Sequence, residues 1–244
     1  MKNFEYIFQS GTHKWAILHV DSDRSEHIID TNECLIMSEG EYLLTDPGGL
    51  EIFPSIFTSL TEQINPEEIN QIFASHQDPD IISSYPMWLS INKNIKCHIS
   101  SIWSTFITHF GGTMENIVPI PDEGKKITVG QVELELIPAH YLHSSGNFHL
   151  YDRTAKILFS GDVGAAIGKK AFDLFVNNFD EHIKYAEGFH KRWMGSVPAR
   201  DLWCKRVGDL EVDLMVPQHG SIYRGEDVKR FINWFQNLDI GYFR

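Results

Sequence analysis

One short segment of the sequence concentrates side chains that bind metal ions. In FASHQDPDII, residues 73–82, His76, Asp78 and Asp80 occupy alternate positions directly after an apolar run. Imidazole nitrogens and carboxylate oxygens are ligands that zinc and iron take in proteins. The segment therefore predicts a metal-binding loop, whose metal would either activate a water molecule or bind a small gas.

Three further positions carry the same ligand types. They are His143 in AHYLHSSGNF, Asp162 in LFSGDVG and His219 in VPQHGSIY, and each comes where an apolar, strand-like run gives way to a turn. Rigid strand ends preset the geometry that a metal needs. We therefore expect the four loops to converge on one site.

Each of these residues also has an ordinary interpretation. A single histidine is more often a hydrogen-bonded core or surface residue, and SGD is a common loop sequence. Asp78 and Asp80, on either side of Pro79, could instead cap a helix that starts near Ile81, because aspartate is favoured at helix N-termini. Only the combination of the four loops, in their order along the chain, favours a metal centre.

The elements that must position these loops are visible in the hydrophobic pattern. β-Branched and aromatic runs alternate with helical apolar spacing in the first half of the chain. Strands are expected at 15–20, 33–37, 41–45, 69–76 and 96–100, and helices at 52–64, 85–92 and 101–110. The last of these helices is expected to end at the glycine pair 111–112.

The second half begins with period-two alternation, which predicts two hairpins turning at Val129–Gly130 and at Asp152–Arg153. Helices are then expected at 179–194, 199–207 and 226–238, with a strand within 212–220. We find no repeat, linker or low-complexity tract. The pattern predicts one domain over residues 1–244, with mixed sheets covered by helices.

Composition excludes several classes of function. Hydrophobic residues make up 42% and charged residues 22%, as in ordinary globular proteins, and the formal net charge of −12 argues against binding nucleic acid. No signal peptide or apolar run of membrane-spanning length is present, so we expect a cytoplasmic protein without membrane contact. The cysteines are isolated and are expected to be reduced: Cys34, Cys97 and Cys204.

The order of the four loops, together with TDPGG at 45–49, resembles the metallo-β-lactamase fold. This resemblance implies an α/β architecture, an αββα sandwich of two mixed sheets covered by helices. The hydrolases of that fold carry His-x-His-x-Asp-His, and here Asp78 and Ile81 replace two of those histidines. A carboxylate at the third position instead resembles the flavodiiron proteins, whose motif reads His-x-Glu-x-Asp and whose metal is iron. The match continues through LHSSGNF, FSGD and PQHG.

The resemblance implies a ligand set for two iron ions. One iron would be held by His76, Asp78, His143 and Asp162. The other would be held by Asp80, Asp162 and His219. His143 is favoured over His140 because it follows leucine and precedes a small-residue turn, which leaves His140 to orient a ligand. Ile81 leaves positions on the second iron open for dioxygen.

Flavodiiron proteins carry a flavodoxin domain after this core, and the sequence ends at Arg244 without one. The resemblance therefore implies a stand-alone diiron protein with no flavin bound in this chain. Its ferrous pair would bind dioxygen as a diferric peroxide, in the role of an oxygen sensor or carrier that signals to a partner protein. A homodimer is possible, since the sequence does not decide the oligomeric state.

Two other functions remain open at this point. One is a reductase of dioxygen or nitric oxide that takes electrons from an external donor protein. The other is a zinc hydrolase, against which Asp78 and Ile81 count. Iron content and the response of the ferrous protein to dioxygen separate the three.

Overall fold

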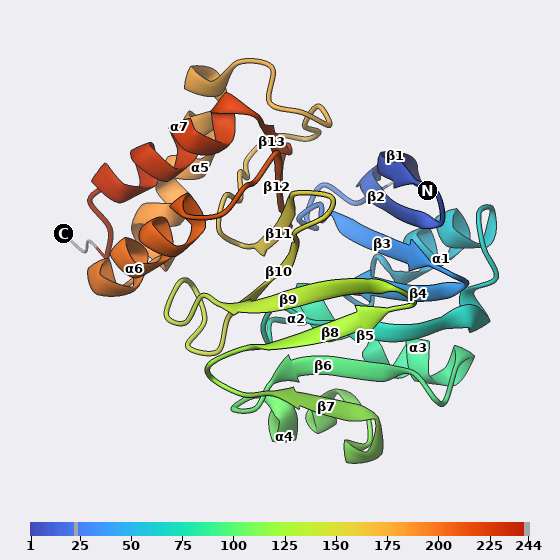
Figure 1. Ribbon diagram of the computed structural model, residues 1–244. Coiled ribbons are helices and arrows are strands. Elements are labelled where there is room, and N and C mark those ends of the chain that lie inside the picture. Colours follow the sequence, from blue (N-terminus) through green and yellow to red (C-terminus); the bar gives the residue numbers. More distant parts are fainter. Residues whose placement is uncertain (22–23, 242–244) are drawn as a thin grey trace.

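The strands of the protein form two sheets (Figure 1). The computed structural model describes residues 1–21 and 24–241, and all counts below refer to these residues. The first sheet has seven strands in chain order: β1 Lys2–Ser10, β2 His13–Asp21, β3 Glu33–Ser38, β4 Glu41–Thr45, β5 Ile69–Phe73, β6 Lys96–Ser100 and β7 Ile117–Ile120. The second has six, in the order β13 Tyr223–Arg224, β12 Leu214–Pro217, β11 Ile157–Gly161, β10 Phe148–Asp152, β9 Val132–Pro138 and β8 Lys125–Val129.

Helices cover the outer face of each sheet. The α-helices are α1 Phe53–Thr61, α2 Pro79–Ile82, α3 Tyr85–Ile91, α4 Ser104–Ile107, α5 Phe179–Trp193, α6 Val197–Gly208 and α7 Glu226–Asn237. Short 3-10 helices lie at η1 Pro66–Glu68, η2 Thr108–Phe110 and η3 Met114–Asn116. The helices α1 to α4 pack on the first sheet, while α5 to α7 group together on the second (Figure 1). This arrangement confirms the predicted αββα sandwich.

Strand periodicity explains why each sheet is buried on both faces. In β2, Trp15 and Ile17 point into the core between the two sheets, while Ala16 and Leu18 point into the core under the first set of helices. Successive side chains of a strand lie on opposite faces, so a central strand of a covered sheet must be apolar throughout. The fold therefore has three apolar layers, and the middle one holds the two sheets together.

Parallel pairing brings the functional loops to one edge of each sheet. β4, β5, β6 and β7 are parallel neighbours, and β11 is parallel to β12. The loops after β4 and β5 therefore leave the first sheet at the same edge, and the loops after β11 and β12 leave the second sheet together. His76 follows β5, Asp162 follows β11, and His219 follows β12.

Most predicted elements are confirmed, with local differences. The first hairpin turns at Gly130–Gln131, one residue later than expected, since Val129 pairs with Val132. The second turns over residues 153–156. The expected helix at 101–110 is split into α4 and η2, and it ends at Gly111, whose φ of 103° suits a residue without a Cβ.

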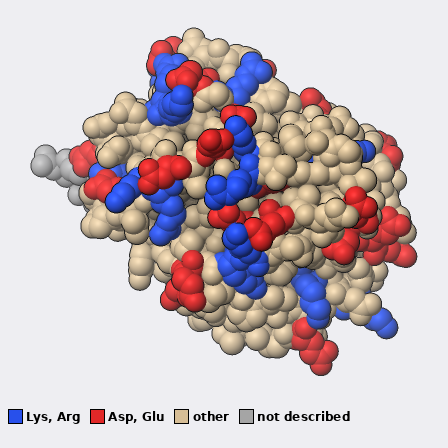
Figure 2. Space-filling model, in the orientation of Figure 1, with Lys and Arg blue, Asp and Glu red and all other residues tan. Residues whose placement is uncertain are grey.

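Charged side chains of both signs are mixed on one face of the molecule. On the face shown in Figure 2, Lys and Arg side chains alternate with Asp and Glu rather than gathering into one basic surface. In the part of the chain that the structure describes, no helix is both long enough and apolar enough to cross a membrane.

We expect the buried histidine His98 on β6 to make the protein less stable in mild acid. Burial, aided by Lys125, lowers its pKa from 6.5 to about 4, and its Nε2 lies 3.0 Å from Oε1 of Gln71. Because the folded-state pKa is depressed, the unfolded chain binds the proton first. Stability is therefore lost as the pH falls from about 6.5 towards 4.

The expected loss from His98 alone is about 2 kcal/mol between pH 7 and pH 5. Urea unfolding of the metal-free protein at both pH values, compared with His98→Gln, measures it. The exposed His27 provides the control, because His27→Gln should leave the pH dependence unchanged. An unchanged pH dependence in His98→Gln would show that the burial of this imidazole carries no such cost.

Candidate metal centre

The loop after β5 presents His76, Asp78 and Asp80 without using the two carboxylates as helix caps. The helix α2 begins at Pro79, and Asp78 occupies its N-cap position but makes no side-chain capping bond. Asp80 lies in the first turn of this four-residue helix. The alternative in which these aspartates cap a helix is therefore wrong for Asp78, and both carboxylates turn to other partners.

Four of the predicted ligands form a first group. His76, Asp78, His143 and Asp162 place one ligand atom each within 4.8 Å of all the others. Nε2 of His143 lies 2.7 Å from Oδ2 of Asp78 and 3.4 Å from Oδ2 of Asp162. Nε2 of His76 lies 3.6 Å and 3.5 Å from the same two oxygens.

The remaining two predicted ligands meet the same aspartate from its other side. Nε2 of His219 lies 3.4 Å from Oδ1 of Asp162 and 3.3 Å from Oδ2 of Asp80. Asp162 thus directs one carboxylate oxygen to each group. The structure brings all six predicted ligand residues together, with Asp162 between two sets of donors.

The donor atoms fit a pair of metal ions. Two ligands that share one ion through bonds of about 2.1 Å lie roughly 3 Å apart, and the separations here are close to that. Nε2 of His76 and Oδ1 of Asp162 are buried and have no hydrogen-bond partner among the described residues. Buried polar atoms are normally satisfied, so these two atoms are suited to metal coordination.

Electrostatics at the centre favours a cation. Burial alone would raise the pKa of Asp162, but the imidazoles of His219 and His76 hold it well below its usual value. Burial alone would lower the pKa of His76, yet the carboxylates of Asp162 and Asp78 raise it to about 10. The carboxylates therefore stay ionised, and the buried imidazoles face a negative field that a divalent cation can neutralise.

A buried chain of hydrogen bonds orients His76. Ser75 donates its backbone N–H and its hydroxyl to Asp46, at 2.6 Å and 2.8 Å, and Nδ1 of His76 lies 2.9 Å from that hydroxyl oxygen. Because the serine proton goes to Asp46, Nδ1–H of His76 donates to Ser75, which leaves Nε2 free as a ligand. Burial raises the pKa of Asp46 to about 7. From the sequence, Asp46 is only part of a turn.

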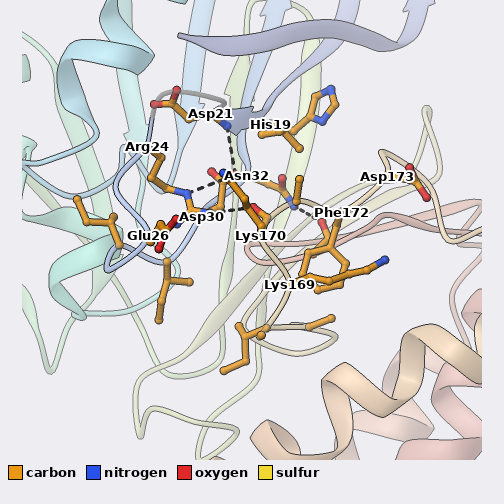
Figure 3. Close-up of a pocket in the computed structure, with 18 of the residues that line it drawn as sticks. His19, Asp21, Arg24, Glu26, Asp30, Asn32, Lys169, Lys170, Phe172 and Asp173 are labelled. Carbon is orange, nitrogen blue, oxygen red and sulfur yellow. Dashed lines mark hydrogen bonds and ion pairs between the residues drawn. The ribbon is translucent and has the colours of Figure 1, made fainter.

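Asp30 orients His219 in the same way. Nδ1 of His219 donates to the backbone oxygen of Asp30 at 2.7 Å, which leaves Nε2 towards Asp162. Asp30 also lines a pocket of about 960 Å³ between residues 19–21 and 24–32 on one side and 166–174 on the other, and Gly220 contributes to the same pocket. Figure 3 shows Asp30 and Arg24 joined across one side of this pocket, with Nε 3.7 Å from Oδ2.

His143 and His140 have different surroundings. His143 lies in the centre, with a φ of 69° that is uncommon for a residue with a side chain. His140 instead places Nε2 2.8 Å from the backbone oxygen of Asp122 and packs its ring on Phe148. The preference for His143 as the ligand is therefore supported by position. The expectation that His140 orients a ligand is not supported, because its hydrogen bond to Asp122 and its ring contact with Phe148 lead away from the centre.

We expect the two histidines to respond differently to substitution. His143→Ala should lower metal affinity by at least about 10-fold, because it removes a donor from the first group. His140→Ala should leave the affinity unchanged. Titration of the metal-free variants with Co²⁺, followed by visible absorption, measures both. A loss of affinity in His140→Ala equal to that in His143→Ala would contradict the assignment.

Two aromatic rings of α5 cover His143. The Trp193 and Phe189 rings lie 5.0 Å and 5.9 Å from the imidazole, and 5.9 Å from each other in a stacked arrangement. Trp193 is 52% exposed, so this ring connects the centre with the surface. Helical spacing alone does not distinguish such residues from ordinary core.

Trp193 should report metal binding by its fluorescence. Co²⁺ bound beside His143 is expected to quench the emission of this indole, which is one of six tryptophans in the chain. Trp193→Phe should abolish the change while leaving the affinity nearly intact. Equal quenching in the wild type and in Trp193→Phe would place the metal elsewhere.

The two sheets, their helices and the ligands at the strand ends define a metallo-β-lactamase-like protein with a candidate dinuclear centre. A family model described as ODP family beta lactamase matches residues 29–220. The chain belongs to this family.

Solved structures of the chemotaxis sensor ODP agree with this family assignment. The chemotaxis sensor ODP, solved as a peroxy diiron species, is 37% identical with a TM-score of 0.88, and the match covers 98% of this chain and 96% of that one. Its apo state, from T. denticola, matches equally well.

More distant structures share the fold. A flavo di-iron protein from Thermotoga maritima, solved as a variant, is 19% identical with a TM-score of 0.81, and the match covers 97% of this chain and 61% of that one. Rubredoxin oxygen:oxidoreductase from Desulfovibrio gigas is 15% identical with a TM-score of 0.82, covering 95% and 61%. No curated protein matches the chain.

Proposed function

We propose that the protein binds dioxygen at a pair of iron ions and acts as an oxygen sensor. The observation that carries the proposal is the position of Asp162, whose two carboxylate oxygens face two separate sets of donors. The 37% identical relative, described as a chemotaxis sensor with a peroxy diiron species, supports the choice of iron and of dioxygen.

The chain's own residues would divide the work as follows. His76, Asp78 and His143 hold one iron and His219 and Asp80 hold the other, with Asp162 shared between them. When bound, the ferrous pair supplies the electrons that dioxygen needs in order to bind. Because three carboxylates would not fully neutralise two divalent cations, the centre would keep a net positive charge that favours an anionic ligand.

Asp80 is the most exposed of the six predicted ligand residues. Its side chain is 40% exposed, against 29% for Asp78 and 7% or less for the other four. Ile81, which follows Asp80, is fully buried in the core of the first sheet and offers no ligand. We infer that the second iron has few protein ligands, which leaves positions open for the gas.

A sensor must pass its state to another molecule, so the proposal includes a signalling partner protein in the cytoplasm. The stacked rings of Trp193 and Phe189 on His143 are the connection from the centre to the surface that we favour for this signal. Nothing in this role requires a flavin.

Metal analysis tests the proposal against a hydrolase. Protein made in iron-replete cells should contain about two iron ions per chain, and its anaerobic ferrous form should develop a lasting visible absorption band on mixing with dioxygen. Zinc in place of iron, together with cleavage of a test ester, would contradict the iron proposal. Rapid bleaching with consumption of an added electron donor would instead identify a reductase.

A further inference from the structure

The bridging Asp162 lies in a turn whose backbone is held by side chains from other elements. The segment runs from Ser160, near the end of β11, to Ala166, and residues 162–164 form its turn. Ser160 donates its hydroxyl to the backbone oxygen of Val163 at 2.7 Å, and the N–H of Ala166 donates to the backbone oxygen of His219 at 3.0 Å. The position of Asp162 relative to His219 therefore depends on how firmly this turn is fixed.

Gly164, two residues after Asp162, is held on both of its backbone groups. Its N–H donates to Nε2 of His190 at 3.0 Å, and its carbonyl accepts from the Tyr223 hydroxyl at 3.0 Å. Its φ is 102°, and an added Cβ would lie only 3.0 Å from the methyl carbon of Met215. The turn is thus closely packed, and both polar contacts are buried.

The surroundings of His190 make its Nε2 a hydrogen-bond acceptor for Gly164. Its Nδ1–H donates to the backbone oxygen of Ala186 at 2.8 Å, which fixes the tautomer and leaves the Nε2 lone pair for Gly164. The ring is fully buried, with Phe231 and Phe235 at 5.5 Å and 5.2 Å. Burial lowers its pKa to about 4, so at neutral pH the imidazole keeps this lone pair.

We propose that His190 and Tyr223 are positioning residues that hold the Gly164 peptide, and through it the bridging carboxylate of Asp162, in the geometry that two metal ions share. The inference rests on the proposed dinuclear centre. It assigns a role to two buried polar side chains that would otherwise be taken as helix and strand core. It also makes α5 the helix that contacts both sides of the centre, since Trp193 of the same helix packs on His143.

The test compares variants that remove the contact with one that only loosens the packing. His190→Leu removes the acceptor, and His190→Gln restores a side chain that can both accept and donate. Tyr223→Phe removes only the hydroxyl. Phe235→Leu is the control, because it opens the same aromatic box around His190 and leaves the hydrogen bond in place.

Titration with Co²⁺ provides the first measurement. His190→Leu and Tyr223→Phe should bind both ions about 10-fold to 100-fold more weakly than Phe235→Leu, while His190→Gln should stay within about threefold of wild type. Equal affinities in His190→Leu, Tyr223→Phe and Phe235→Leu would overturn the inference. If His190→Leu does not fold, the affinity of Tyr223→Phe, which lacks only one hydroxyl group, decides the test.

Hydrogen exchange of the metal-free proteins provides a second measurement that needs no metal. Residues 160–166 should exchange faster in His190→Leu and Tyr223→Phe than in Phe235→Leu, and equal rates would overturn the role of the two side chains. Wild-type protein that fails to bind two Co²⁺ ions would refute the dinuclear centre, while the exchange rates would still decide whether the turn is held as proposed.

Discussion

Asp162→Asn is expected to lower the affinity for both metal ions by more than about 100-fold, which is above the effect of losing an outer partner. The reason is that this one carboxylate faces both donor groups, at 3.4–3.5 Å from His76 and His143 and 3.4 Å from His219. Asparagine offers one neutral oxygen, so it cannot serve two cations. Iron content after anaerobic reconstitution measures the effect.

Asp152→Asn is the matched control for Asp162→Asn. Asp152 is also a buried aspartate, on β10, but it accepts hydrogen bonds from Trp15 and from the backbone of Ala155, away from the centre. This variant should keep both ions even where it costs stability. Retention of two tightly bound irons in Asp162→Asn would show that the carboxylate is not shared.

Removal of the metal should lower the melting temperature by at least about 15 °C. Each ion present at about 1,000 times its dissociation constant stabilises the fold by about 4 kcal/mol, and a chain of this size gains roughly 2–4 °C for each kcal/mol. Without the ions, three carboxylates and three imidazoles face one another with buried atoms such as Nε2 of His76 unsatisfied. Calorimetry with and without a chelator measures the difference.

The same measurement on Asp162→Asn separates metal binding from other effects of the chelator. In that variant the melting temperatures with and without chelator should nearly coincide, since little metal is bound in either case. A wild-type protein whose melting temperature does not change on chelation would contradict a metal centre that joins the two sheets.

The convergence of the predicted ligand residues could be expected from the sequence because their loops follow apolar strands, whereas the ligand set itself was implied by the resemblance to the flavodiiron proteins. His76, Asp162 and His219 follow β5, β11 and β12, and parallel pairing forces such positions to one edge of a sheet. Sheets covered by helices were predictable for a related reason, since strands buried on both faces have a continuous apolar pattern, and the resemblance added the αββα arrangement. In the first sheet each strand pairs with the strands that precede and follow it in the chain.

The supporting residues could not be identified in the same way. Asp46 is part of a turn in the sequence, and His190 has the helical spacing of a core residue, because a contact between α5 and the loop after β11 leaves no local pattern. The strand β1 was also missed. Its alternation is masked by charges. The strand pairs antiparallel with β2 along its length, and at its start Nζ of Lys2 forms a buried ion pair, 2.9 Å from Oε2 of Glu33.

The resemblance to the flavodiiron proteins predicted the separation of the ligand residues into two groups, and the structure shows its physical cause. By residue type alone, Asp78 and Asp80 are equivalent carboxylates on either side of a proline. In the fold, α2 begins between them, so that Asp78 faces His143 and Asp80 faces His219. The placement of the two carboxylates in two separate groups of donors is thus a consequence of one helical turn.

The amount of dioxygen taken up by the anaerobic ferrous protein tests the central claim most directly. An oxygen electrode should record rapid uptake of about one dioxygen molecule for each pair of iron ions, followed by no further consumption. Asp162→Asn should take up almost none. Uptake that continues without limit, or no uptake by wild-type protein that holds two ferrous ions, would contradict the account of the protein as a dioxygen-binding diiron sensor.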